Sequence, residues 1–126
     1  MKIAVVMGSK SDLPKLESGI DLIKSYGIEV VVRILSAHRT PMELTSFLDE
    51  IKDNTDVIIA AAGKAAHLPG VIAAQTLIPV VGLPIKSSTM DGLDSLLSIV
   101  QMPSGIPVAT VTIDSGMNAA LMAIQI

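Results

Sequence analysis

The sequence sets a histidine beside an arginine at His38-Arg39, and its second histidine is His67. Histidine gains and loses a proton near neutral pH, so one imidazole can act as acid and then as base. Arginine offers a planar pair of N–H donors that fits a phosphate or a carboxylate. The pair therefore predicts a site that holds an anionic substrate and moves a proton on it. The structural alternative is a histidine bonded to loop backbone and an arginine on the surface.

A second candidate is the N-terminal segment Gly8-Ser9-Lys10-Ser11-Asp12. Gly8 allows a tight turn, and the two serines can add hydroxyl donors to backbone N–H groups that face a phosphate. Asp12 would repel a phosphate but suits a ribose hydroxyl. The segment matches neither G-x-x-x-x-G-K-[ST] nor G-x-G-x-x-G, so it favours a phosphorylated sugar over a nucleoside triphosphate or a dinucleotide. The alternative is that Ser11 or Asp12 caps the helix that follows.

The third candidate is the stretch of residues 60–70, which carries little side-chain bulk before His67. Small side chains let a planar ligand lie close to the main chain, although tight packing between a helix and a sheet would need them equally. We interpret His67 by itself as an N-cap or an orienting group rather than a general acid. Methionines such as Met90 and Met117 are expected to fill the core or an interface.

Five apolar, β-branched runs predict five strands, and helical patterns of period three to four lie between them. The expected strands are Ile3–Met7, Val30–Leu35, Val57–Ala61, Pro79–Leu83 and Pro107–Ile113. Because these runs are continuous, each strand should be covered on both faces of a parallel sheet. Strand and helix alternating in this way predict a three-layer αβα, doubly wound, flavodoxin-like sheet of order 2-1-3-4-5. All three candidate segments then lie at the carboxyl ends of the strands.

The helical patterns have recognisable ends. Thr40-Pro41-Met42-Glu43 predicts a capping box with proline at the first helical position, so the second helix should begin there. Gly27 stands where the first helix should stop. The last two helices are predicted from apolar residues that repeat at three or four positions: Leu93, Leu96, Leu97, Val100 and then Met117, Ala120, Leu121, Ile124.

Composition narrows the class of protein. A chain of 126 residues predicts a single domain, residues 1–126, and with 50% hydrophobic residues it is expected to hide apolar surface in a homo-oligomer. A net charge of −3 and 2% aromatic residues argue against nucleic acid as a partner.

The apolar runs of the sequence are too short to cross a membrane. The absence of cysteine, and of histidine spacing typical of metal ligands, predicts no metal. A strand at the N-terminus, in place of a signal segment, predicts a cytoplasmic protein.

Four motifs together resemble one family. Residues 6–12 (VMGSKSD), 36–41 (SAHRTP), 65–70 (AAHLPG) and 98–107 (SIVQMPSGIP) are closely similar to the N5-carboxyaminoimidazole ribonucleotide mutases of purine biosynthesis, in the same order and over essentially the whole chain. The resemblance implies a reaction without cofactor or metal, in which a carboxylate moves from the exocyclic nitrogen of an imidazole ribonucleotide to ring carbon C4. It also implies an octamer with sites at subunit junctions.

The resemblance assigns roles to individual residues. His38 would be the proton carrier, giving a proton during decarboxylation and removing the C4 proton during recarboxylation. Ser9, Asp12 and Arg39 would hold the ribose phosphate end with help from Ser11. The loop from Gly63 to Leu68 would line a closed pocket that retains CO₂. The full set of expected binding residues is Ser9, Ser11, Asp12, Ser36, Arg39, Gly63, Ala65, His67 and Leu68.

Two features depart from the family pattern, and two other functions stay open. Lys64 stands where a second glycine is expected after Gly63, and the chain ends at Ile126, where relatives are expected to continue into a further C-terminal helix. The nearest rival activity is direct carboxylation of aminoimidazole ribonucleotide by CO₂, although the intact Ala65–Gly70 run resembles the mutases more. The non-enzymatic rival is a nucleotide-sensing relative impaired by Lys64.

Overall fold

A computed structural model describes all residues, 1–126, and its centre is a parallel sheet of five strands. The order across the sheet is β2-β1-β3-β4-β5, as the sequence predicts. The strands are β1 (Lys2–Met7), β2 (Glu29–Ile34), β3 (Val57–Gly63), β4 (Val80–Ile85) and β5 (Ala109–Thr110).

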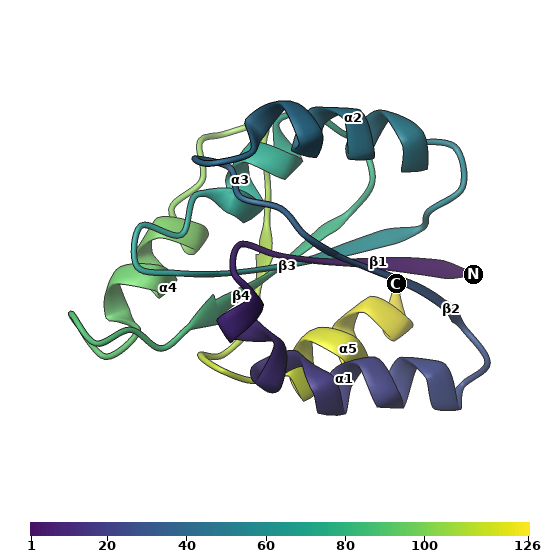
Figure 1. The fold of residues 1–126 in the computed structure, drawn as a ribbon, viewed down its shortest axis with the longest axis horizontal. Helices are drawn as coiled ribbons and strands as arrows, with labels where there is room; N and C mark the ends of the chain where they lie inside the picture. The colour runs from purple at the N-terminus through teal and green to yellow at the C-terminus, as the bar shows by residue number, and fades with distance from the viewer.

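Helices cover both faces of this sheet. α1 (Leu13–Ser25) and α5 (Gly116–Gln125) lie on one face, whereas α2 (Pro41–Ile51), α3 (Leu68–Ala73) and α4 (Leu93–Val100) lie on the other, as Figure 1 shows. A short 3₁₀ turn, Lys10–Asp12, leads into α1. The three-layer, flavodoxin-like fold is therefore confirmed. No helix is both long and apolar enough to span a membrane.

The side-chain alternation of the central strands builds two cores. In β1, Ile3, Val5 and Met7 face α1 and α5, while Ala4 and Val6 face the opposite layer. All these residues are fully buried, as expected of parallel strands that are covered on both sides. A rigid sheet of this kind fixes the positions at which its strands end and the connecting loops begin.

The two edge strands differ from the prediction. β2 is only half buried, with Glu29, Arg33 and Ile34 exposed, because a strand at the edge lacks a neighbour and a full cover. β5 was expected over residues 107–113, but only Ala109 and Thr110 pair with β4. Continuous apolar residues therefore do not require a long strand when the segment lies at the edge of the sheet.

The apolar patterns predicted for the last two helices are buried only in part: Ala120 is fully buried and Ile124 packs against the core, but larger side chains of both patterns are exposed. In α4 the core receives Ser95 and Ile99, and Leu93, Leu97 and Val100 are exposed. In α5 it receives Gly116, Ala119, Ala120 and Ala123, and Met117 and Leu121 are exposed. The helices α1 and α5 approach so closely that only small residues fit between them: a Cβ added to Gly19 would collide with the carbonyl oxygen of Gly116. The larger apolar side chains consequently point outward.

The end of α1 agrees with the sequence-based prediction, and the start of α2 agrees with it only in part. α1 stops where Gly27 adopts a φ of +73°, a left-handed conformation that glycine adopts at little cost, and its N–H donates to the carbonyl of Lys24. α2 begins at Pro41 as predicted, but the predicted capping box is absent, since the Thr40 side chain makes no capping bond to the helix.

Candidate active site

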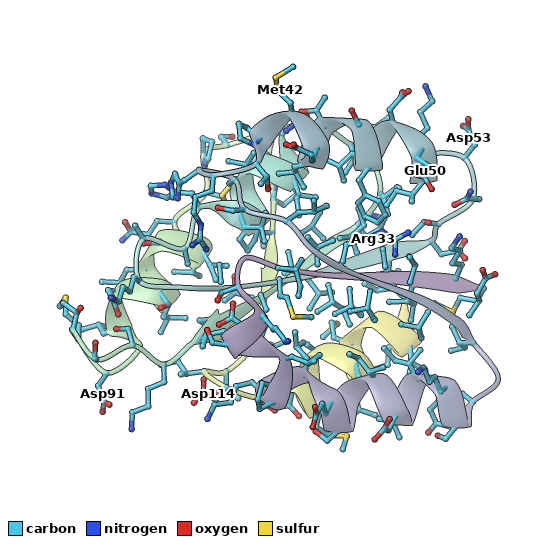
Figure 2. The ribbon with its side chains drawn as sticks, viewed as in Figure 1. Arg33, Met42, Glu50, Asp53, Asp91 and Asp114 are labelled. Atoms are coloured by element: carbon cyan, nitrogen blue, oxygen red, sulfur yellow. The ribbon has the colours of Figure 1, made fainter.

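A cavity of about 630 Å³ opens where the strands end, and all ten residues predicted for the site line it. These are Ser9, Ser11, Asp12, Ser36, His38, Arg39, Gly63, Ala65, His67 and Leu68. They come from the loops that follow β1, β2 and β3, which the parallel sheet brings to one edge. In Figure 2, Asp91 and Asp114 mark this end of the molecule, while Glu50 and Asp53 lie at the far end of α2.

The loop after β1 is ordered by its own hydroxyl groups. Ser9 Oγ accepts a hydrogen bond from the Ser11 amide at 3.3 Å and lies 2.9 Å from Ser11 Oγ. Ser9 thus caps the 3₁₀ turn. Asp12 is the N-cap residue of α1, as the alternative predicts, but its side chain makes no capping bond. Gly8 has no left-handed φ and an added Cβ would meet nothing, so the turn itself does not require glycine there.

Asp12 is a buried carboxylate on the wall of the cavity. Burial raises the pKa of Asp12 above its ordinary value of 3.8, a hydrogen bond with the Ser9 backbone lowers that pKa, and the charge of Asp114 raises it further. A carboxyl group that is costly to ionise gains from a hydrogen-bond donor on a ligand. A sugar hydroxyl is such a donor.

The loop after β2 is held in a tight turn by two side chains. Ser36 Oγ accepts hydrogen bonds from the amides of His38 and Arg39, at 3.3 and 3.0 Å. Thr40 Oγ1 accepts from the Ser36 amide at 2.8 Å and donates to the Ser36 carbonyl at 3.2 Å. These bonds explain why Thr40 does not cap α2: its hydroxyl closes the turn that presents His38 and Arg39 instead.

Arg39 joins the loops after β1 and β2. Its Nη2 donates a hydrogen bond of 3.1 Å to the carbonyl oxygen of Gly8. The side chain is exposed and has no carboxylate partner, so the remaining guanidinium donors are free for a ligand. An anion between this guanidinium and the hydroxyls of Ser9 and Ser11 would meet positive charge and hydrogen-bond donors together.

His38 and His67 meet across the cavity although they come from different loops. His38 Nε2 lies 2.8 Å from His67 Nδ1, and the two rings are arranged edge to face. His67 is the N-cap residue of α3, as one interpretation predicts, but its side chain makes no capping bond. Its contact with His38 agrees instead with the interpretation of His67 as an orienting group.

The loop after β3 supplies a wall of small residues. Gly63, Ala65 and the buried Ala62 line the cavity together with Leu68, the first residue of α3. Within the loop, the amides of Ala66 and His67 donate to carbonyls two residues back, each at 2.8 Å. Lys64 also lines the cavity and has a φ of +55°.

The predicted set of site residues leaves out the segment after β4. Lys86, Ser87 and Ser88 line the cavity, as does Ile85 at the end of the strand. The Lys86 amide donates to Asp114 Oδ1 at 2.7 Å, and its ammonium lies 3.0 Å from Asp91 Oδ1, an arrangement that raises the pKa of Lys86. The signal was available in the sequence, because this segment follows a strand at the same edge. Ala37 and Gly8 complete the lining.

No group of three or more histidine, cysteine, aspartate or glutamate side chains is gathered to hold a metal ion. The cavity's own side chains offer a pair of imidazoles, a guanidinium, an ammonium from Lys64, hydroxyl groups and a buried carboxyl. Together they can bind an anion, accept a hydrogen bond from a hydroxyl and transfer a proton.

Comparison with known proteins decides the family. The model of the family described as AIR carboxylase matches residues 2–126. The chain belongs to the AIR carboxylase family. Among similar members, the N5-carboxyaminoimidazole ribonucleotide mutases of Pyrococcus abyssi and Saccharolobus solfataricus are each 52% identical over 126 residues, which is 99% of this chain and 72% and 80% of those proteins.

The AIR carboxylase family also includes longer proteins. The phosphoribosylaminoimidazole carboxylase of Ogataea methanolica is 54% identical over 125 residues, but these cover 98% of this chain and only 23% of that protein. Among solved structures, the crystal structure of Treponema denticola PurE is similar with a TM-score of 0.89 and 33% identity, covering 98% of this chain and 78% of that one. The fold of this chain is therefore similar to that of a solved PurE structure.

Proposed function

We propose that this chain is an N5-carboxyaminoimidazole ribonucleotide mutase that acts in purine biosynthesis through the cavity at the carboxyl ends of its strands. The observation that carries the proposal is the placement of His38 beside His67 in the same cavity as Arg39, Ser9 and Ser11. The imidazoles can transfer a proton, and the guanidinium and the hydroxyl groups can bind a phosphate.

The phosphate end is formed by the loops after β1 and β2. Arg39 and the hydroxyls of Ser9 and Ser11 bind the ribose phosphate, and Asp12 accepts a hydrogen bond from a ribose hydroxyl. The hydrogen bond from Arg39 to the Gly8 carbonyl supports this role, because it holds the guanidinium over the loop that carries both serines. Ser36 shapes the turn that presents Arg39 and also lines the cavity.

The reactive end is formed by His38. As the bond between the exocyclic nitrogen and the carboxylate breaks, CO₂ departs, the electron pair stays on nitrogen, and His38 gives this nitrogen a proton. Carbon C4 then attacks the CO₂, and His38 takes the C4 proton back, so that proton and charge balance over the cycle. One group that serves as acid and then as base suits an imidazole.

Between the two steps CO₂ must stay in the site. The walls formed by Gly63, Ala65 and Leu68 are small or apolar, so they present little that would hold water in place of the gas. Their position beside His67 brings this part of the cavity next to His38.

The mutase is favoured over the direct carboxylase. The mutases of Pyrococcus abyssi and Saccharolobus solfataricus are of comparable length to this chain, whereas this chain spans only 23% of a phosphoribosylaminoimidazole carboxylase of similar identity. The direct carboxylase and an impaired sensor would both use the same cavity, so the distinction between them lies in the substrate that is turned over.

We also propose that residues 1–126 act as one mutase domain within a homo-oligomer, an octamer in view of the family resemblance. The apolar side chains that α4 and α5 leave exposed support the assembly, since such surface is costly in water. They are Leu93, Leu97 and Val100 on α4, and Met117, Leu121 and Met122 on α5. A cytoplasmic location stays a prediction.

Two parallel assays test the activity. One supplies the N5-carboxylated ribonucleotide, and the other supplies aminoimidazole ribonucleotide with bicarbonate; both follow formation of the C4-carboxylated product. We expect efficient product formation in the first assay. Efficient use of the second pair alone would make the chain a direct carboxylase, and binding of ribonucleotide without product in either assay would favour the sensor.

A further inference from the structure

Lys64 adopts a backbone conformation that is unfavourable for its side chain. Its φ of +55° is in the left-handed region, where a residue with a Cβ is strained by the following carbonyl oxygen. The other non-glycine residues with positive φ are Asp91 and Asp114, whose short polar side chains tolerate it better. Glycine is expected at this position and adopts such a φ at little cost, so the lysine adds a charged side chain at the cavity wall together with backbone strain that glycine would not have.

The ammonium group of Lys64 has no partner in the protein. Lys2, Lys15, Lys52 and Lys86 each form an ion pair with a carboxylate, whereas Lys64, like Lys10 and Lys24, forms none, and its side chain makes no hydrogen bond. The residue is exposed and lines the cavity. Its charge is therefore available to an anion that enters the site.

The position of Lys64 places this charge on the reactive side of the cavity. Gly63 and Ala65 flank it on the same wall, and His67, which contacts His38, follows three residues later. Arg39, in contrast, is tied to the loop after β1 by its bond to Gly8. Lys86 also lines the cavity, but it is paired with Asp91, so Arg39 and Lys64 are the two cationic side chains without a carboxylate partner that a ligand with a phosphate and a carboxylate could meet.

We propose that the ammonium of Lys64 binds the carboxylate that the reaction moves; this inference rests on the proposed function. The ammonium attracts the carboxylate of the substrate and of the product but has little attraction for neutral CO₂. Lys64 therefore stabilises both carboxylated states relative to the decarboxylated intermediate. It favours recapture of CO₂ over its escape, and it lets the site distinguish carboxylated from uncarboxylated ribonucleotides.

The test is calorimetric titration of two ligands, the C4-carboxylated ribonucleotide and aminoimidazole ribonucleotide, against the wild-type chain, Lys64→Gln, Lys64→Arg and Lys64→Gly. A charge-assisted contact at a partly open site predicts that Lys64→Gln weakens the carboxylated ligand by about five- to tenfold. Binding of the uncarboxylated ligand should stay within a factor of about two, and Lys64→Arg should keep most of the preference.

Lys64→Gly removes both the charge and the backbone strain, so comparison with Lys64→Gln separates the effect of the charge on affinity from the effect of the strain on stability. It should lose affinity for the carboxylated ligand as Lys64→Gln does, while its thermal unfolding midpoint rises by a few degrees because the strain is relieved. Lys24→Gln is the matched control, since Lys24 is an exposed residue near the end of α1, outside the cavity lining. It removes the same charge and should change neither affinity.

Three results would overturn the inference. The first is an unchanged affinity of Lys64→Gln for the carboxylated ligand, and the second is an equal loss of affinity for both ligands, which would assign the lysine to the phosphate. The third is an equal loss of affinity in Lys24→Gln. Failure of the proposed function is distinguishable from each of these. A chain that is not a mutase would form no C4-carboxylated product from the N5-carboxylated ribonucleotide, whatever the Lys64 variants bind.

Discussion

His38 Nε2 and His67 Nδ1 lie 2.8 Å apart, although 29 positions separate the two residues in the sequence. One of these nitrogens donates and the other accepts, so the protonation of one ring constrains the tautomer of the other. The hydrogen bond also connects the loops after β2 and β3. The imidazole that we assign to proton transfer is therefore held in a defined direction before substrate arrives, leaving its Nδ1 without a protein partner.

Replacement of His38 by asparagine should abolish turnover and leave binding largely intact. The amide still offers a polar group toward His67, but it cannot exchange a proton near neutral pH, so we expect kcat to fall by about 10²- to 10⁴-fold. Steady-state kinetics together with titration of aminoimidazole ribonucleotide separate the two effects. Full activity of the asparagine variant would defeat the assignment of His38.

Replacement of Arg39 by alanine should mainly weaken binding. In the proposed function the guanidinium would hold the phosphate in both ground state and transition state, so KM should rise by about 10- to 100-fold with a smaller change in kcat. Arg33→Ala is a suitable control, because Arg33 is exposed on β2, outside the cavity, where its guanidinium lies over the Phe47 ring. A large fall in kcat at constant KM for Arg39→Ala would assign the residue to chemistry instead.

The raised pKa of Asp12 predicts how stability depends on pH. Between 3.8 and the higher pKa of the folded protein, the native chain binds more protons than the unfolded chain, so the free energy of unfolding decreases as pH rises through this window. An asparagine side chain at this position has no charge to bury. Asp12→Asn should therefore be the more stable protein at pH 7, and its advantage should shrink below pH 4.

Urea unfolding of Asp12→Asn and wild type at several pH values measures this difference. Asp53→Asn, a change at an exposed position at the far end of α2, is the control for charge alone. An advantage of Asp12→Asn that stays constant from pH 3 to 8 would contradict the assignment of the cost to ionisation. Substrate binding should nevertheless weaken in Asp12→Asn, since a carboxylate accepts a ribose hydroxyl more strongly than an amide does.

The contact between α1 and α5 predicts a severe effect for a single methyl group. A Cβ on Gly116 would collide with the carbonyl oxygen of Lys15 and crowd Leu16, so Gly116→Ala should lower the free energy of unfolding by about 2–4 kcal/mol. Gly8→Ala adds the same methyl group where nothing lies within 4 Å, and it should change stability little. Equal stability of the two variants in denaturant titrations would contradict the close packing of these helices.

The sheet order and the cavity were predictable because they follow from rules that act along the whole chain. Alternating strands and helices restrict the topology, and a parallel sheet gathers the loops that follow its strands. Ser9, Arg39 and His67 are far apart in sequence, yet their places after β1, β2 and β3 suffice to bring them to one cavity.

The predictions that were wrong concern contacts that a periodic pattern in the sequence does not encode. Leu93 and Met117 follow the spacing of a core face, but an apolar face looks the same in sequence whether it meets the sheet or lies on the surface. Thr40 has the spacing of a capping residue, yet its hydroxyl binds Ser36. The left-handed backbone of Lys64 has no signature in a single sequence, since lysine does not favour it.

The most direct measurement is a crystal structure of the chain with aminoimidazole ribonucleotide bound. We expect the phosphate between Arg39 and the hydroxyls of Ser9 and Ser11, with ring carbon C4 about 3.5 Å from a nitrogen of His38. A ribonucleotide bound elsewhere, or an imidazole of His38 that points away from the heterocycle, would contradict it.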